Sequence, residues 1–307
     1  MSALLLSAAL ALLLASLTPW LPAWRNHLVD LPSHFPVQYV IGALLLFPAS
    51  LFFHAPLAAA TFAIAFCLNF FQLMPFLPRA PAAPAGKTFK ILQSNVLKSN
   101  KDAESLRRLI EAEKPDIIAC AEVTPLFAKM LDGLDYPHRL ITPGVRDYGM
   151  AVLSRLPFSK MEKLNFGGAR TEALIFRFEF DGRTIDAASL HPFTPLHNLR
   201  SRDDEFAALA ERFGAEKPER LILMGDFNAT PWCPAMKRLT KTLGLRYARQ
   251  GFGVRASWPS ILPFPFLRLP IDHVLVSANL GVAGFRLGPF IGSDHLPTVT
   301  TVYIANT

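Results

Sequence analysis

Six short clusters of acidic, amide and histidine residues each follow an apolar run in residues 88–307. They are Ser94-Asn95, Glu122, His191-Pro192, Gly225-Asp226-Phe227-Asn228, Ile271-Asp272-His273 and Ser293-Asp294-His295. Each cluster alone is compatible with a helix cap, an Asx turn or a structural Asp-His pair. The six together predict a single site, because strand ends meet at one rim of a sheet and active sites commonly form there.

The chemistry that these residue types favour is hydrolysis of a phosphoester. An anionic phosphate repels an anionic nucleophile, so the reaction needs a divalent cation, an activated water and donors for the developing charge. Mg²⁺ prefers carboxylate oxygens, which Glu122 and Asp294 supply, and Asn95 adds an amide. Mn²⁺ suits the same donors. The sequence leaves open whether one or two metal ions bind.

The remaining residues of the clusters have chemistry that fits catalytic roles. Asp226 is predicted to orient and deprotonate the water, and Asn228 to donate to the phosphate. His191 and His295 are predicted to donate as imidazolium to the transition state. Asp272 is predicted to hold His295 in one tautomer and to raise its pKa. The identity of the base stays open.

The elements that must position these residues alternate between strands and helices. Strands are predicted at Phe89–Val96, Asp116–Glu122, Gly149–Ser154, Glu172–Phe180, Thr184–His191, Arg220–Asp226, Ile271–Ser277 and Thr298–Ile304, and helices at Lys101–Glu113 and Leu199–Phe213. The Asp181-Gly182 turn predicts a hairpin, which argues against a purely parallel sheet. The pattern predicts an α/β domain over residues 88–307.

The first 78 residues differ from the rest in charge. They hold one basic residue, Arg25, and one acidic residue, Asp30, so the net charge of +7 lies entirely after residue 78. Three membrane spans are predicted near residues 2–20, 37–53 and 56–77, with a turn at residues 53–56. The Pro- and Ala-rich stretch at 78–87 is predicted to be an extended linker that holds the catalytic domain just off the membrane.

Two alternatives to this membrane prediction stay open. A buried helical hairpin of a soluble protein normally keeps a polar face, which this segment lacks. A signal peptide at residues 1–24 normally carries a basic start, which is also missing. The protein is therefore predicted to be a multi-pass protein of the cell membrane. The positive-inside rule favours a cytoplasmic catalytic domain, but the side depends on whether the first span is real.

The motifs resemble those of the endonuclease/exonuclease/phosphatase superfamily. They are, in order, ILQSNV, PDIIACAEV, YGMAVLSR, HPFTP, GDFNATPW, IDHVLVS and GSDHLPTV. The resemblance covers residues 88–307 and implies a four-layer α/β sandwich, two sheets face to face with helices outside. It also implies Mg²⁺-dependent phosphoester hydrolysis, and the N-terminal spans resemble a bacterial membrane-attached branch. Tyr148 precedes a strand that the family places near its site, and Arg170 is a weaker candidate for phosphate contact.

Three substrate classes compete. The positive charge fits nucleic acid, and it equally fits anionic lipid headgroups beside a tethered domain. The loop Trp258–Leu269 (WPSILPFPFLRL) is rich in large apolar residues and is a candidate for contact with lipid. A lipid-linked phosphate or pyrophosphate is therefore expected, with nucleic acid as the alternative and a soluble phosphorylated metabolite third. An inactive membrane scaffold is the remaining alternative, and no feature predicts a protein partner.

Overall fold

Two six-stranded sheets form the centre of the catalytic domain. The computed structural model describes residues 1–22, 26–80, 83–84, 86–144, 149–165 and 172–305. The first sheet contains β1 (Thr88–Asn95), β2 (Ile117–Ala121), β3 (His138–Thr142), β4 (Met150–Ser154), β11 (Leu280–Leu287) and β12 (Thr298–Ile304). The second contains β5 (Phe158–Asn165), β6 (Glu172–Phe180), β7 (Arg183–Leu190), β8 (Leu221–Asp226), β9 (Leu245–Tyr247) and β10 (Asp272–Ser277). Their orders are β11-β12-β1-β2-β4-β3 and β5-β6-β7-β8-β10-β9.

The sheets are mixed, as the hairpin turn predicted. β1 pairs with β2 and β7 with β8 in parallel, and the other pairs are antiparallel. Parallel neighbours end at the same edge, so β1 with β2 and β7 with β8 bring their carboxyl ends together. The clusters at Asn95, Glu122, His191 and Asp226 all stand at these ends.

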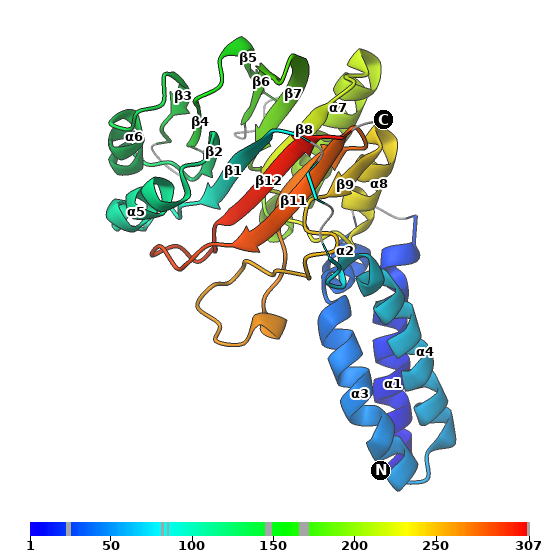
Figure 1. Ribbon diagram of the computed structural model, residues 1–307. Coiled ribbons are helices and arrows are strands. Elements are labelled where there is room, and N and C mark those ends of the chain that lie inside the picture. The colour runs from blue at the N-terminus through cyan, green and yellow to red at the C-terminus, as the bar shows by residue number, and fades with distance from the viewer. Residues whose placement is uncertain (23–25, 81–82, 85, 145–148, 166–171, 306–307) are drawn as a thin grey trace.

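The main core lies between the two sheets, and helices cover both outer faces (Figure 1). β6 shows why. Phe176 and Phe178 alternate with Ile175 and face the first sheet, where Phe178 meets Phe89 at a ring distance of 5.6 Å. Helices α5 (Ala103–Glu113) and α6 (Pro125–Asp132) lie outside the first sheet. Helices α7 (Pro195–Glu216) and α8 (Pro234–Leu243) lie outside the second. The predicted four-layer α/β sandwich is confirmed.

Three apolar helices precede this domain and extend from it as a bundle (Figure 1). They are α1 (Ser2–Leu17), α3 (Pro36–Phe52) and α4 (Pro56–Leu73), with short turns η1 (Thr18–Trp20) and η3 (Met74–Phe76) continuing α1 and α4. Ser2–Trp20 and Pro56–Phe76 are each long and apolar enough to cross a membrane. α3 reaches that length only together with α2 (His27–Asp30) and η2 (Leu31–His34), from which it is bent by 69°. The described residues thus contain two or three candidate spans.

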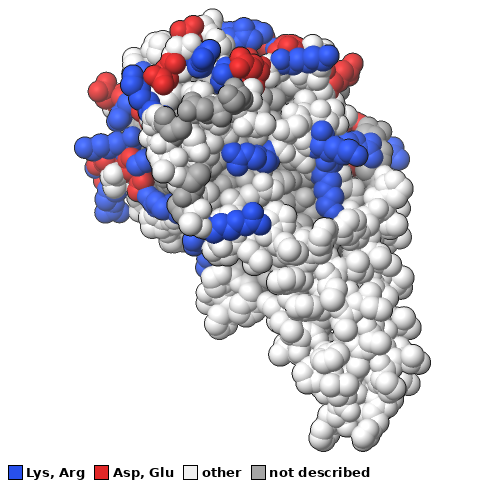
Figure 2. All heavy atoms as spheres, turned by 45° about the vertical axis from the view of Figure 1, so that its right-hand side comes forward, with Lys and Arg blue, Asp and Glu red and all other residues white. Residues whose placement is uncertain are grey.

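The charged side chains are confined to the catalytic domain on the face shown in Figure 2, where the helical bundle is free of Lys, Arg, Asp and Glu. The bundle nevertheless packs directly against the domain. The Phe76 ring lies 6.0 Å from Trp232 and 5.9 Å from Tyr247, inside the core beneath α7 and α8. Gly253 N–H donates to the Phe76 carbonyl at 2.8 Å, and Arg79 N–H to the Gly251 carbonyl at 2.7 Å.

This docking differs from the expected spacer at residues 78–87. The chain is already anchored in the domain core at Phe76, before the Pro- and Ala-rich stretch begins. The stretch therefore leads to the first residue of β1 from a point on the domain surface. The physical reason is burial of Phe76, which is 4% exposed, against two aromatic rings.

Candidate active site

The amide of Asn95 joins the two sheets at their common edge. Its Nδ2 donates to Glu122 Oε1 at 2.9 Å and to Asp226 Oδ2 at 3.0 Å. Asn95 ends β1, Glu122 follows the neighbouring β2, and Asp226 ends β8 of the second sheet. One buried amide thus fixes the position of two carboxylates that come from opposite layers.

Two residues of the site hold left-handed backbone conformations, which are uncommon for non-glycine residues. Glu122 has φ = 58° and accepts from Lys98 N–H through Oε2 at 2.9 Å. Asn228 has φ = 49°, donates its N–H to Asp226 Oδ1 at 2.9 Å and donates Nδ2 to the Pro192 carbonyl at 2.9 Å. Strain of this kind concentrates at functional sites, because surrounding bonds must hold it.

Gly225 lets β8 approach the end of β7. Its φ is 142°, and a β-carbon there would stand 2.0 Å from the Leu190 carbonyl oxygen. No other residue type fits such a close approach. The approach places His191 beside Asp226, with His191 Nε2 at 3.7 Å from Asp226 Oδ2 and 3.8 Å from Glu122 Oε1.

His295 lies between two aspartates. Its Nδ1 is 2.9 Å from Asp272 Oδ2, and its Nε2 is 3.6 Å from Asp226 Oδ2. Asp272 accepts further bonds from Gln93 Nε2 at 3.0 Å and from Ser257 Oγ at 2.5 Å. Asp272 also accepts from Nδ1–H of His295, and this bond directs Nε2 of the ring toward Asp226.

Burial and mutual charge shift the pKa values of this group. Burial acts to lower the pKa of His295, but the charges of Asp272 and Asp226 outweigh it and raise that pKa to about 10. Burial raises the pKa of Asp226, with Asp272 adding to the rise and His295 opposing it. Burial would also raise the pKa of Asp272, but His295 and the hydrogen bonds to its carboxylate lower it. These shifts favour the protonated form of His295, the charged form of Asp272 and the neutral form of Asp226.

Asp294 is placed by the loop that precedes β10. Trp258 Nε1 donates to Asp294 Oδ2 at 3.0 Å, and Ser260 N–H donates to the Asp294 carbonyl at 2.7 Å. The other carboxylate oxygen, Oδ1, is buried and has no hydrogen-bond partner among the described residues. It lies 3.9 Å from His295 Nε2. A buried, unpaired carboxylate oxygen is costly unless a ligand satisfies it.

The donor set fits a hard divalent cation. Oxygens are the ligands that Mg²⁺ and Mn²⁺ prefer, and Asn95, Glu122 and Asp294 offer them at the same edge of the two sheets. Both carboxylate oxygens of Asp272 accept hydrogen bonds from the protein, and so do both oxygens of Glu122, from Asn95 Nδ2 and Lys98 N–H. Asp294 Oδ1 has no such partner among the described residues, so it is the carboxylate oxygen of the site most open to a cation.

A second potential ligand group, Asp30, His34 and Cys233, is satisfied internally. The guanidinium of Arg202 donates to both oxygens of Asp30, at 2.6 and 3.1 Å. His34 Nε2 lies 3.1 Å from Asp30 Oδ2, and its Nδ1 accepts from Thr230 N–H at 3.2 Å. A cation there would compete with a buried guanidinium, so these residues form a structural network.

This network connects the N-terminal helices to the catalytic loop. A backbone N–H can only donate, so His34 Nδ1 is an acceptor, and Nε2–H donates to Asp30. Thr230 stands four residues after Asp226 and two after Asn228. The segment between α1 and α3 therefore supports the turn that carries two candidate catalytic residues.

The structure brings together eight of the predicted site residues. They are Asn95, Glu122, His191, Asp226, Asn228, Asp272, Asp294 and His295. Tyr148 and Arg170 lie outside the described residues. His273 points into the core, where its Nε2 donates to the Ala229 carbonyl at 2.8 Å.

Several contacts of the site were not expected from the sequence. Gln93 and Ser257 hold Asp272, Trp258 holds Asp294, and His34 holds Thr230. Gln93 stands inside ILQSNV, so its motif gave a signal, and Trp258 begins the apolar loop. No sequence pattern pointed to His34, because its hydrogen-bond partner Thr230 lies 196 residues further along the chain.

The chain matches a known protein family and the fold of several solved structures. Residues 92–295 match the model of the Endonuclease/Exonuclease/phosphatase family. D. rerio TDP2 complexed with single strand DNA product is 17% identical, with a TM-score of 0.60, over 72% of this chain and 100% of that one. The human Nocturnin catalytic domain with bound sulfate is 20% identical, with a TM-score of 0.57, over 73% and 97%. A family protein from Bacteroides thetaiotaomicron is 14% identical, with a TM-score of 0.60, over 73% and 100%.

No curated protein matches the chain. At these identities the solved structures establish the fold, and the family model spans every residue of the acid, amide and histidine cluster from Asn95 to His295. The match to the family model, the two-sheet fold and the strand ends that meet at one edge all lead to the same assignment. The chain belongs to the endonuclease/exonuclease/phosphatase family, whose members are metal-dependent hydrolases of phosphoester bonds.

Proposed function

We propose that the protein is a membrane-tethered, Mg²⁺-dependent phosphoesterase that hydrolyses a phosphodiester, phosphomonoester or pyrophosphate of a lipid-linked substrate. The observation that carries the proposal is the loop Trp258–Leu269. It contacts both an acidic residue of the candidate site and a helix of the N-terminal bundle. Substrate, membrane and site would meet at this loop.

The loop is anchored at two points. At its start, Trp258 donates to Asp294, and near its end the Phe266 carbonyl accepts from Gln38 Nε2 of α3 at 2.7 Å. Between these points Ile261 is 73% exposed and Phe264 55% exposed. The loop projects from the side of the domain from which the helical bundle also extends (Figure 1). Large exposed apolar side chains beside candidate membrane spans favour contact with lipid.

Two other exposed apolar residues lie on segments that carry site residues. Leu196 follows His191 by five residues, and Phe290 precedes Asp294 by four. Both are more than half exposed. This distribution supports a substrate that brings an apolar chain to the site along with its phosphate.

The side chains have roles that their surroundings favour. Asp226, buried and with a raised pKa, would take a proton from the attacking water. His295, with a pKa of about 10, would stay protonated and donate to the developing negative charge, and His191 would donate beside it. Asn228 would orient the phosphate, and Asp272 would hold the His295 ring.

A divalent cation held by Glu122, Asp294 and Asn95 would withdraw charge from a nonbridging phosphate oxygen. Mg²⁺ is the proposed ion, and Mn²⁺ suits the same donors. We place the enzyme in the cell membrane as a multi-pass protein, with lipids as its surroundings. The basic residues that follow α4 favour a cytoplasmic catalytic domain.

Nuclease activity is the second candidate. The net charge of +7 lies in the catalytic part, and basic surfaces attract nucleic acid phosphates. D. rerio TDP2, which has the same fold, was solved with a single strand DNA product. The exposed apolar loop distinguishes the two candidates, because a nucleic acid offers no apolar chain to it.

A parallel hydrolysis assay tests the proposal. The full-length protein in detergent receives an isoprenyl pyrophosphate or plasmid DNA, with Mg²⁺ or EDTA, and Asp226→Ala serves as the inactive control. The expected result is Mg²⁺-dependent phosphate release from the lipid, lowered at least 100-fold by Asp226→Ala, the lower end of typical general-base contributions of about 10²–10⁴. Nicking of DNA without lipid hydrolysis would establish the nuclease alternative.

A further inference from the structure

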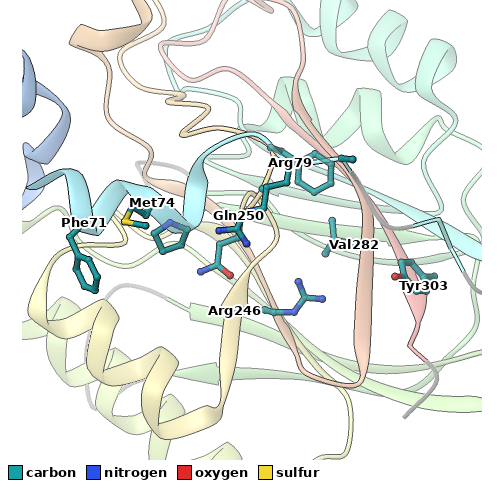
Figure 3. A pocket seen from close by; sticks show the side chains of 11 residues that line it. Phe71, Met74, Arg79, Arg246, Gln250, Val282 and Tyr303 are labelled. Atoms are coloured by element: carbon teal, nitrogen blue, oxygen red, sulfur yellow. The ribbon is translucent and has the colours of Figure 1, made fainter.

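A cleft of about 590 Å³ lies at the junction between the end of α4 and the catalytic domain (Figure 3), and no residue of the candidate site lines it. Phe71 and Met74 line it from the end of the candidate span. Arg79, Arg246, Gln250 and Tyr303 line it from the polypeptide that follows and from the domain. The wall from the bundle is therefore apolar, and the walls from the domain combine the two arginines with apolar side chains such as Phe252 and Val282.

The two arginines differ in how they are held. Arg79 is fixed through its backbone, whose N–H donates to the Gly251 carbonyl, and its side chain is exposed. Arg246, on β9, donates one Nη2–H to the Leu280 carbonyl at 2.7 Å, which leaves its other donors for a ligand. None of the described lining residues is acidic. The cleft is therefore complementary to an anion.

The side chains around the cleft are of the kinds found where apolar helices end at a membrane surface. Trp20 at the end of α1 stacks on Phe71 at a ring distance of 6.2 Å. Lys237 Nζ lies 4.7 Å above the Trp20 ring and donates to the Pro19 carbonyl at 2.9 Å. Aromatic rings and lysine side chains at the ends of apolar helices are typical of the lipid headgroup region. Lys and Arg side chains also stand along this junction in Figure 2.

We propose that this cleft binds an anionic phospholipid, with the phosphate held by Arg79 and Arg246 and the glycerol and first acyl carbons against Phe71 and Met74. A single molecule of this kind would touch both the bundle and the catalytic domain. It would stabilise the arrangement in which the domain rests on the membrane. The site is separate from the proposed reaction and does not depend on it.

Lipid retention on the full-length protein tests the proposal. The protein is purified in a mild detergent and stripped of lipid. It is then titrated with phosphatidylglycerol or phosphatidylcholine, and the bound lipid is counted by native mass spectrometry. The wild type is expected to bind phosphatidylglycerol at least tenfold more tightly than phosphatidylcholine, because only the former carries a net negative charge. Equal affinity for the two lipids would overturn the proposal.

A matched pair of variants locates the binding. Arg79→Gln/Arg246→Gln is expected to lose roughly tenfold or more in affinity for phosphatidylglycerol, since both charge-assisted contacts are removed. Lys163→Gln/Arg183→Gln removes the same charge from exposed positions on β5 and β7 and is expected to keep wild-type affinity. Equal losses in both variants would show a general charge effect and contradict the proposal.

Inorganic phosphate distinguishes a lipid site from a simple anion site. At the concentration at which phosphatidylglycerol saturates the protein, phosphate alone is expected to leave the bound lipid in place, because it offers no apolar part to Phe71 and Met74. Displacement of the lipid at equal concentration would reject the lipid assignment. If the arginine variant is unstable, the comparison of the two lipids on the wild type still decides the matter.

Discussion

At the scale of single residues, the site depends on one amide and one buried imidazole. Asn95 fixes Glu122 and Asp226 across the two sheets, and Asp272 holds His295 with its charge toward Asp226. Asn95, Glu122, Asp226, Asp272 and His295 were predicted from the sequence, because such polar residues recur there beside apolar runs. Three of them stand at the carboxyl ends of strands, whereas Asp272 begins β10 and His295 lies in the loop before β12. The partners that hold them, such as Ser257 for Asp272, were not predictable, since hydrogen bonds between distant segments leave no local pattern.

Substitution of Asp272 tests the electrostatic coupling at this scale. Asp272→Asn removes the largest of the interactions that raise the pKa of His295, so that pKa falls from about 10 toward its ordinary range. If protonated His295 is required, activity declines on the alkaline side, and the decline moves to lower pH in the variant. A pH profile of kcat for the two proteins measures the shift. If kcat declines at the same alkaline pH in both proteins, the titration of His295 does not cause that decline.

The raised pKa of His295 also makes the stability of the folded protein depend on pH. The folded-state pKa of His295 is raised, so its contribution to stability is full below the ordinary value of 6.5. That contribution is lost as the pH rises through the folded-state value of about 10. Stability of the wild type should therefore decline between these two values more than that of Asp272→Asn.

At the scale of elements, the turn after β8 is supported from outside the catalytic domain. Thr230 N–H donates to His34 Nδ1, and the Thr230 hydroxyl lies 2.9 Å from the same nitrogen. Eight of the twelve strands in the described residues, and the helix at residues 101–113, were predicted from apolar runs, from alternation and from the apolar face of that helix. The strands β3, β5, β9 and β11 were not predicted. η2 and its histidine were not, because a four-residue turn between apolar helices carries no periodic signal.

His34→Ala tests this support. The substitution leaves a buried N–H of Thr230 without its acceptor, at a cost of about 1–3 kcal/mol, and loosens the turn that carries Asp226 and Asn228. We expect kcat to fall by roughly tenfold, an amount that corresponds to about 1.4 kcal/mol, while KM changes little. His34→Asn, which keeps an acceptor, should recover part of the loss. Equal activity of His34→Ala and wild type would contradict the role.

At the scale of the whole molecule, the apolar helices and the catalytic domain form one packed body. Arg202 of α7 is fully buried and pairs with Asp30 at 2.6 Å and with Asp203 at 2.7 Å. The change in composition near residue 78 was visible in the sequence, and the composition favoured a spacer there. The contacts of Phe76 and Arg202 are long-range, so composition alone did not predict the docking.

Arg202→Met tests this connection. Removal of the guanidinium takes away the positive charge that pairs with the buried carboxylates of Asp30 and Asp203, and breaking a buried pair in this way costs about 3–5 kcal/mol. The expected result is a clearly lower thermal midpoint for the full-length protein in detergent. Arg200→Met, an exposed position on the same helix, is the control and should leave the midpoint nearly unchanged. A variant as stable as this control would show that the buried pair does not join the two parts.

The most direct test of the account compares two isoprenyl pyrophosphates that differ only in chain length. In mixed micelles the wild type should hydrolyse the long-chain substrate with a kcat/KM at least tenfold above that for the short, soluble one. The proposed contact of the exposed Ile261 and Phe264 with the chain would supply the difference. The double variant Ile261→Ser/Phe264→Ser should lose this preference yet still hydrolyse the short substrate. The control Met161→Ser, at an exposed position on β5, should keep the preference and the hydrolysis of the short substrate. Equal rates on the two substrates in the wild type would contradict a lipid-linked substrate.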